Sequence, residues 1–215
     1  MTQVFRRRAE LGVKLALLSL FALAALAFAL LVGGARSFEP LGEPVEQPIP
    51  FSHKHHVGDD GIDCRYCHTT VETKPFAGLP SSDTCLTCHS QLYTDAKVLA
   101  PLRESAATGK PIAWRRVHEL PDFVYFDHSV HVAKGVACIE CHGRVDQMPL
   151  TWRVAPMQMQ WCLACHRDPA PHLHAPGDAF RMDLVPLSGA EVATLARAAQ
   201  LHDRDRLTQC STCHR

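Results

Sequence analysis

The feature that most constrains this chain is a pattern that recurs five times and uses every cysteine. The sequence of 215 residues contains ten cysteines, and each consecutive pair has the form C-x-x-C-H. We refer to these segments as motif 1 (Cys64–His68), motif 2 (Cys85–His89), motif 3 (Cys138–His142), motif 4 (Cys162–His166) and motif 5 (Cys210–His214). The fold must therefore accommodate five sites of the same chemical type.

Three familiar uses of paired cysteines fit this pattern poorly. A disulfide framework gives no reason for a histidine after every second cysteine. Structural zinc sites combine two C-x-x-C half-sites around one metal, and five half-sites cannot be paired off. A thioredoxin-like redox motif occurs once, within a βαβ pattern that the sequence does not show.

C-x-x-C-H is the attachment signal for c-type haem. Two thiols three positions apart bond to one edge of a porphyrin, and the following imidazole binds the iron. The sequence therefore predicts five covalently bound haems c. The predicted attachment residues are Cys64, Cys67, Cys85, Cys88, Cys138, Cys141, Cys162, Cys165, Cys210 and Cys213, and the predicted proximal iron ligands are His68, His89, His142, His166 and His214.

An internal duplication surrounds the first four motifs. Block 1 (Phe51–His56) precedes motif 1, and the similar block 2 (Phe126–His131) precedes motif 3. Each block is followed by two motifs, so the chain contains two-haem units at about 51–100 and 126–175, with a fifth haem added at 210–214.

The F-x-H-x-x-H form of both blocks resembles the small multihaem class III cytochromes. That resemblance implies that the paired histidines bind irons on the distal side, which assigns His53, His56, His128 and His131 as distal ligands. His55 has no counterpart in block 2 and is not assigned.

The fifth distal ligand is less constrained. We favour His118, which lies just before block 2, with Met159 second and His202 third; Met148 is a further thioether candidate. A methionine in this position raises the potential of a haem. His172 and His174 lie in a proline-rich stretch and are expected at the surface.

The N-terminal part reads as a membrane anchor. Residues 15–34 carry no charge and are long enough to cross a bilayer. A cleaved signal peptide is the alternative, but the apolar stretch is long for one. Arg6, Arg7 and Arg8 place residues 1–14 on the cytoplasmic side, so 35–50 form an exported linker and 51–215 an exported haem domain. We therefore expect a single-span protein of a bacterial inner membrane, in contact with lipid, with its haem domain in the periplasm.

The remaining sequence predicts little regular structure. Fifteen prolines and twelve glycines interrupt it. Ser188 and Glu191 form a capping box before a helix that should run to about His202, with an apolar face that packs on a haem or a partner. A second helix is expected over 95–107, on both sides of Pro101. The predicted fold is a mostly irregular multihaem cytochrome c with short α-helices around five haems, plus one transmembrane helix.

The composition and ligand count point to electron transfer. The formal net charge is zero, which gives no basic field for nucleic acid. Irons bound on both sides have no free position for a substrate, so we expect electron transfer rather than catalysis.

The segments 50–69, 116–150, 161–167 and 207–215 resemble the membrane-anchored pentahaem cytochrome c subunit of bacterial alternative complex III. The resemblance implies a relay of electrons in a respiratory or photosynthetic chain, with an iron–sulfur subunit, a quinol-binding integral membrane subunit and a monohaem cytochrome c as partners. Two alternatives remain: a quinol dehydrogenase subunit that feeds a periplasmic reductase, and a free periplasmic electron shuttle.

Overall fold

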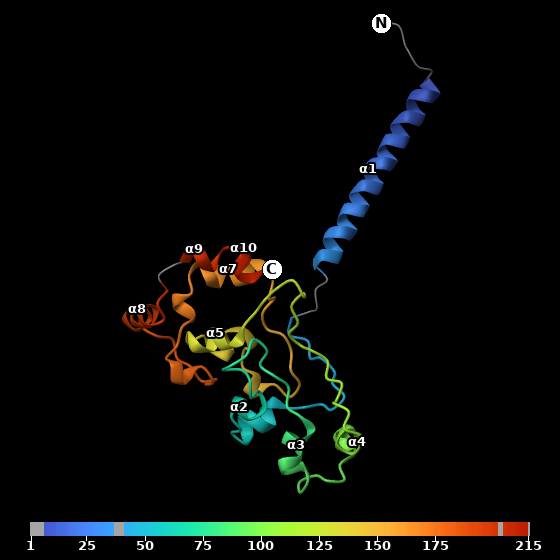
Figure 1. Cartoon of the computed structure of the whole chain (residues 1–215). Coiled ribbons are helices and arrows are strands. Elements are labelled where there is room, and N and C mark those ends of the chain that lie inside the picture. The colour runs from blue at the N-terminus through green and yellow to red at the C-terminus, as the bar shows by residue number, and fades with distance from the viewer. Residues whose placement is uncertain (1–6, 37–40, 202–203, 215) are drawn as a thin grey trace. The chain divides into compact units, whose positions relative to one another are not determined.

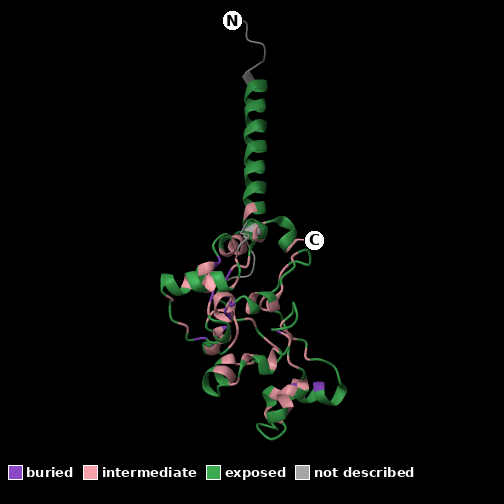
Figure 2. Ribbon diagram, turned by 60° about the vertical axis from the view of Figure 1, so that its left-hand side comes forward, coloured by how far each residue is buried: buried purple, intermediate pink, exposed green. Residues whose placement is uncertain are grey.

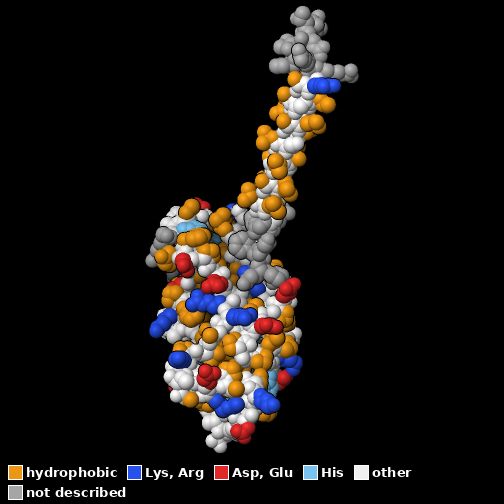
Figure 3. All heavy atoms as spheres, turned by 90° about the vertical axis from the view of Figure 1, so that its right-hand side faces the viewer, with side chains coloured by type: hydrophobic (Ala, Val, Ile, Leu, Met, Phe, Trp, Pro, Cys, Tyr) orange, Lys and Arg blue, Asp and Glu red, His pale blue; other side chains and the backbone are white. Residues whose placement is uncertain are grey.

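A computed structural model describes residues 7–36, 41–201 and 204–214, and the chain divides into two units, Met1–Pro40 and Leu41–Arg215. The first unit is one helix, α1 (Arg7–Arg36), shown in blue in Figure 1. Most of its large apolar side chains are exposed, and Figure 3 shows those on one face. The stretch Arg8–Gly33 is long and apolar enough to cross a membrane, a property that membrane anchors and signal sequences share.

The second unit consists of short helices joined by irregular segments (Figure 1). Among the described residues, extended pairing is limited to isolated bridges such as Val136 with Leu173. The helices are the π-helix η1 (Lys54–Asp59), α2 (Cys64–Cys67), α3 (Ser82–His89), η2 (Lys97–Leu99), α4 (Ala100–Thr108), α5 (His128–Ala133), α6 (Cys138–His142), η3 (Val145–Gln147), α7 (Met159–Arg167), η4 (Ala170–His172), η5 (Pro176–Asp178), α8 (Gly189–Ala198), α9 (Arg204–Leu207) and α10 (Cys210–Cys213). The prediction of a helical, largely irregular domain is confirmed.

Local signals account for most helix ends. The capping box of Ser188 and Glu191 is present at the start of α8. This helix ends at Ala198, before the predicted His202, which lies outside the described residues. α4 begins at Ala100 with Pro101 in its first turn, where the missing amide hydrogen costs nothing. Gly109, with φ of 69°, closes that helix in the left-handed conformation.

The protein core of the second unit is small. Buried apolar residues are scattered rather than layered (Figure 2). The largest fully buried side chains are Leu102, Met148 and Leu173. Large apolar side chains, including Phe76, Tyr93 and Phe123, are more than half exposed. A chain with so little buried apolar surface needs another source of stabilisation, and five porphyrins would supply it.

Candidate haem-binding sites

Each C-x-x-C-H motif lies on a short helix that presents its two thiols on one face. The helices are α2, α3, α6, α7 and α10, and in each the cysteines are three residues apart. Side chains at this spacing lie about one turn apart on the same side of an α-helix. All ten cysteines are free thiols in the structure. The motifs thus have the local geometry that two-point attachment to one porphyrin edge requires.

Seven of the predicted ligand histidines share one hydrogen-bonding arrangement. A carbonyl oxygen can only accept, so a histidine whose Nδ1 meets a carbonyl must carry its proton there, which leaves Nε2 available for a metal. Such bonds are common around metal sites because they fix ring orientation and raise ligand basicity. The Nδ1–carbonyl distances are 2.9 Å for His56, 2.7 Å for His68, 3.1 Å for His89, 2.8 Å for His128, 2.7 Å for His131, 2.9 Å for His166 and 3.3 Å for His214.

Three pairs of predicted ligand histidines have the ring separation that a shared iron would require. Metal–imidazole bonds are about 2.0 Å long, so two imidazoles on opposite sides of one metal keep their ring centroids roughly 6 Å apart. The observed separations are 6.2 Å for His56 with His89, 6.3 Å for His128 with His142 and 6.2 Å for His131 with His166. Each pair joins a histidine of a block to one of a motif.

The rings of block 1 and block 2 are oriented by an aromatic neighbour. Phe51 stacks on His56 at 4.5 Å and meets His53 edge-on at 4.9 Å. Phe126 does the same, stacking on His131 at 4.4 Å and meeting His128 edge-on at 4.8 Å. The phenylalanine at the head of each block therefore has a structural role, because it fixes both histidines.

Burial keeps the central imidazoles uncharged. Burial, with smaller effects from His68 and His56, lowers the pKa of His53 to about 4. Burial also lowers the pKa of His142 to about 3, with further contributions from His118 and His128. Neutral imidazole is the form that binds a metal, so these groups are ready to ligate at neutral pH.

His118 lies against the proximal candidate of motif 3. Its ring centroid is 4.3 Å from that of His142, with the rings almost perpendicular. That separation leaves no room for an iron between the two rings. The Nε2 of His118 is buried without a hydrogen-bond partner, and burial together with Arg153 lowers the pKa of this histidine to about 4.

The other candidates for the fifth distal ligand differ in environment. Met148 is buried in the protein core, whereas Met159, at the start of α7, is 59% exposed. His202 lies outside the described residues. The fifth distal ligand therefore stays a prediction.

His172 and His174 are not the plain surface residues that the proline-rich stretch predicts. His172 Nδ1 lies 2.8 Å from one carboxylate oxygen of Glu140, and His174 Nε2 lies 2.9 Å from the other. The side chain of His174 is only 10% exposed, although that of His172 is 42% exposed. Glu140 is more than 30 residues from both histidines in sequence, so no nearby residue indicated this contact. The only signal in the sequence was the presence of an acidic residue inside motif 3.

Space next to motif 1 is also consistent with a bound group. A cavity of about 330 Å³ opens beside Cys64. Its walls combine apolar side chains with carboxylates, and its lining includes Val57, Ile62, Asp63, Asp146, Phe180 and Met182. Together, the thiol pairs, the free Nε2 atoms, the ring separations and this cavity fit covalently bound haem.

Comparisons with known proteins agree with this chemistry. Residues 124–215 match the family described as cytochrome c7 and related cytochrome c. The chain is 37% identical over 139 residues to the menaquinone reductase multiheme cytochrome c subunit of Nitratidesulfovibrio vulgaris, covering 64% of this chain and 60% of the relative. It is 29% identical over 91 residues to the acrylate reductase cytochrome subunit of Shewanella woodyi, covering 42% of this chain and 57% of the relative.

The chain thus spans about three fifths of the length of these curated relatives. Residues 124–215 are thus similar to multihaem cytochrome c domains, and both relatives are cytochrome subunits of reductases.

Proposed function

We propose that this chain is a membrane-anchored pentahaem cytochrome c that relays electrons within a quinol:electron-acceptor oxidoreductase of the alternative complex III type. Its anchor is the span Arg8–Gly33, and its haem domain faces the periplasm. Its partners are an iron–sulfur subunit, a quinol-binding membrane subunit and a monohaem cytochrome c. Similarity to the cytochrome subunit of a menaquinone reductase supports the link to quinol.

The observation that carries the proposal is the ring pairing. In the pairs His56 with His89 and His131 with His166, both rings orient Nε2 by fixing Nδ1, and their separation suits a shared iron. An iron held from both sides has no vacant position for a substrate, which suits electron transfer and argues against chemistry on a small molecule.

Different residues of this chain attach the haems and orient their ligands. The motif cysteines hold the porphyrin edges, and the backbone carbonyls at Ser52, Pro75, Gly78 and Asp127 orient imidazoles. The phenylalanines of the two blocks restrict ring rotation. Each haem, when bound, carries one electron at a time. A fixed ligand set limits the reorganisation that accompanies each change of charge, which favours fast transfer.

Quinol oxidation by purified proteins tests the proposal. We expect the detergent-solubilised chain alone to leave a menaquinol analogue unoxidised, and the complex with its partner subunits to oxidise the quinol and reduce the haems of this chain. Rapid oxidation of the analogue by the isolated chain would overturn the relay role.

The second candidate, a quinol dehydrogenase subunit that feeds a periplasmic reductase, is favoured by the similarity to an acrylate reductase cytochrome subunit. The same experiment separates the two, because a quinol dehydrogenase would oxidise the analogue unaided. Electron paramagnetic resonance adds an independent readout: the relay role predicts low-spin ferric signals for the paired sites, and a dominant high-spin signal would contradict it.

A further inference from the structure

The five motifs do not follow one another in space as they do in sequence. We propose that they form one unbranched series in the order motif 2, motif 1, motif 3, motif 4, motif 5, so that motifs 2 and 5 are the ends through which electrons enter and leave. This inference rests on the proposed function and deepens it, because it states the path that the relay follows. Four junctions carry it.

Motif 2 adjoins motif 1. The hydroxyl of Tyr66, between the two cysteines of motif 1, lies 2.7 Å from the Oγ1 of Thr87, between the two cysteines of motif 2. The two attachment helices α2 and α3 therefore meet directly.

Motif 1 adjoins motif 3 at a shared strip of backbone. The amide of Cys138 donates to the carbonyl of Ala179 at 2.9 Å, and the thiol of Cys64 lies 4.0 Å from the next carbonyl, that of Phe180. The first cysteines of the two motifs thus contact consecutive residues of one segment.

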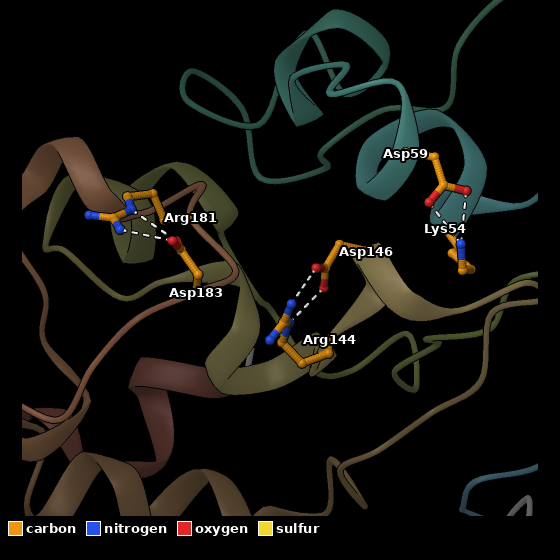
Figure 4. Close-up of polar contacts among 6 residues, drawn as sticks. All are labelled: Lys54, Asp59, Arg144, Asp146, Arg181 and Asp183. Carbon is orange, nitrogen blue, oxygen red and sulfur yellow. Dashed lines mark hydrogen bonds and ion pairs between the residues drawn. The ribbon is translucent and has the colours of Figure 1, made fainter.

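The same junction is held by backbone packing rather than by charge. A Cβ at Gly58 in η1 would collide with the carbonyl of Asp146 in η3. The ion pairs in this region, Lys54–Asp59, Arg144–Asp146 and Arg181–Asp183, each lie within one short segment (Figure 4). None of these three pairs crosses the junction, so the close approach of η1 and η3, rather than charge, holds motif 1 against motif 3.

Motif 3 adjoins motif 4 through its own acidic residue. Glu140, inside motif 3, binds His172 and His174, which follow motif 4. The ring of His131, seven residues before motif 3, has its centroid 6.2 Å from that of His166 in motif 4. Motif 3 and motif 4 are therefore joined on both sides of motif 3 in sequence.

Motif 4 adjoins motif 5. The Nδ1 of His166 donates to the carbonyl of Leu207 at 2.9 Å, and α7 packs against α9, the helix that precedes motif 5.

Exposure gives an independent indication of the ends. Of the ten cysteines, Cys88 of motif 2 and Cys210 of motif 5 are exposed, and the other eight are partly buried. Motif 3, in the middle of the series, is enclosed, since its neighbour Ala137 is buried. Partner redox proteins can therefore approach the series most closely at motifs 2 and 5.

Iron positions in the haem-loaded protein test the order directly. Cryo-electron microscopy of the intact complex should show the shortest iron–iron distances between motifs 2 and 1, 1 and 3, 3 and 4, and 4 and 5. The order is overturned if the iron of motif 2 lies nearer to motif 3, 4 or 5 than to motif 1, or if the nearest neighbour of motif 5 is any motif other than motif 4.

A matched pair of ligand variants tests the order in solution. His56→Met and His131→Met each replace an imidazole with a thioether, which raises the potential of one haem so that it is reduced earlier. A reduced neighbour disfavours further reduction, and this Coulombic effect falls with distance. Redox titration followed by haem-methyl resonances should show the largest downward shift at motif 1 for H56M, and at motifs 3 and 5 for H131M. Equal shifts at all haems, or a larger response of motif 5 than of motif 1 in H56M, would contradict the series.

The two proposals fail separately. A complex that oxidises quinol but has a different iron order overturns the series alone. The expected iron order in a protein that accepts no electrons from its partners overturns the relay function alone.

Discussion

Block 1 and block 2 differ in secondary structure but hold their histidines in the same way. Block 1 continues into the π-helix η1, whereas block 2 continues into the α-helix α5. In both, the second histidine donates Nδ1 to the carbonyl four residues earlier, Ser52 for His56 and Asp127 for His131. The two blocks therefore share the geometry of their rings but not the type of helix. This indicates that the positions of the phenylalanine and the histidines matter more for function than the helix that carries them.

The first histidine of each block distinguishes the two units. The Nδ1 of His53 is bonded to the Thr151 hydroxyl at 2.9 Å, and Thr151 follows motif 3. The Nδ1 of His128 is bonded to the carbonyl of Pro75, which follows motif 1. Each unit thus supplies a partner to the other, but one partner is a side chain and the other is backbone. This difference can be tested by substitution.

The largest expected effect separates the middle of the series from its end. Replacing Cys138 and Cys141 with serine should remove the haem that joins the two units and prevent accumulation of folded protein. Replacing Cys85 and Cys88 should leave a folded protein whose mass is lower by one haem. Haem staining and intact mass spectrometry check both variants. Equal loss of the two proteins would show that every motif is equally structural.

The second effect concerns the junction of the units. Gly58→Ala should lower the free energy of unfolding by about 1–3 kcal/mol, the usual cost of overpacking, because the added methyl group collides with the carbonyl of Asp146. Gly177→Ala is the control, since a Cβ there meets no atom within 4 Å. Denaturant unfolding followed by haem absorbance measures both. Equal stability of the two variants would mean that η1 and η3 do not set the junction.

A smaller and symmetric effect is expected for the two phenylalanines. Phe51→Leu and Phe126→Leu each remove a stacked and an edge-on contact with histidine, worth about 0.5–1.5 kcal/mol per aromatic pair. Both variants should lose similar stability by thermal unfolding at matched haem content. A clear loss in only one of them would show that the two blocks are not equivalent.

The smallest effect tests how the first histidine of each block is held. Thr151→Val removes the acceptor of His53, which lowers the basicity of that imidazole and stabilises the ferric iron less, so one potential should rise. Thr151→Ser keeps the hydroxyl and should leave the potential unchanged. Potentiometric titration distinguishes the two variants. The corresponding acceptor of His128 belongs to the backbone of Pro75, so side-chain substitution cannot remove it.

Sequence reasoning succeeded where the determinants are local. The capping box of α8 and a helix near Pro101 were predicted correctly, because each depends on residues within one or two turns. The predicted apolar face of α8 is also present, because Val192, Leu195, Ala196 and Ala199 are its partly buried positions. That face packs against η4 of the same chain.

Long-range partners were beyond sequence reasoning. Nothing near His53 or His128 in sequence indicates Thr151 or Pro75, which are 98 and 53 residues away. The binding of Glu140 by His174 was missed for the same reason, and the end of α8 was placed too late because its apolar pattern continues past Ala198. Contacts between residues that are distant in sequence depend on how the two-motif units pack against each other. The residue pattern of one sequence does not reveal that packing.

The exchange of partners between His53 with Thr151 and His128 with Pro75 has a consequence for assembly. Each of the two histidines is held by a residue that lies far away in sequence, beyond the motifs of its own segment. Neither ring can therefore reach its final orientation during synthesis until the distant segment has also been made and docked.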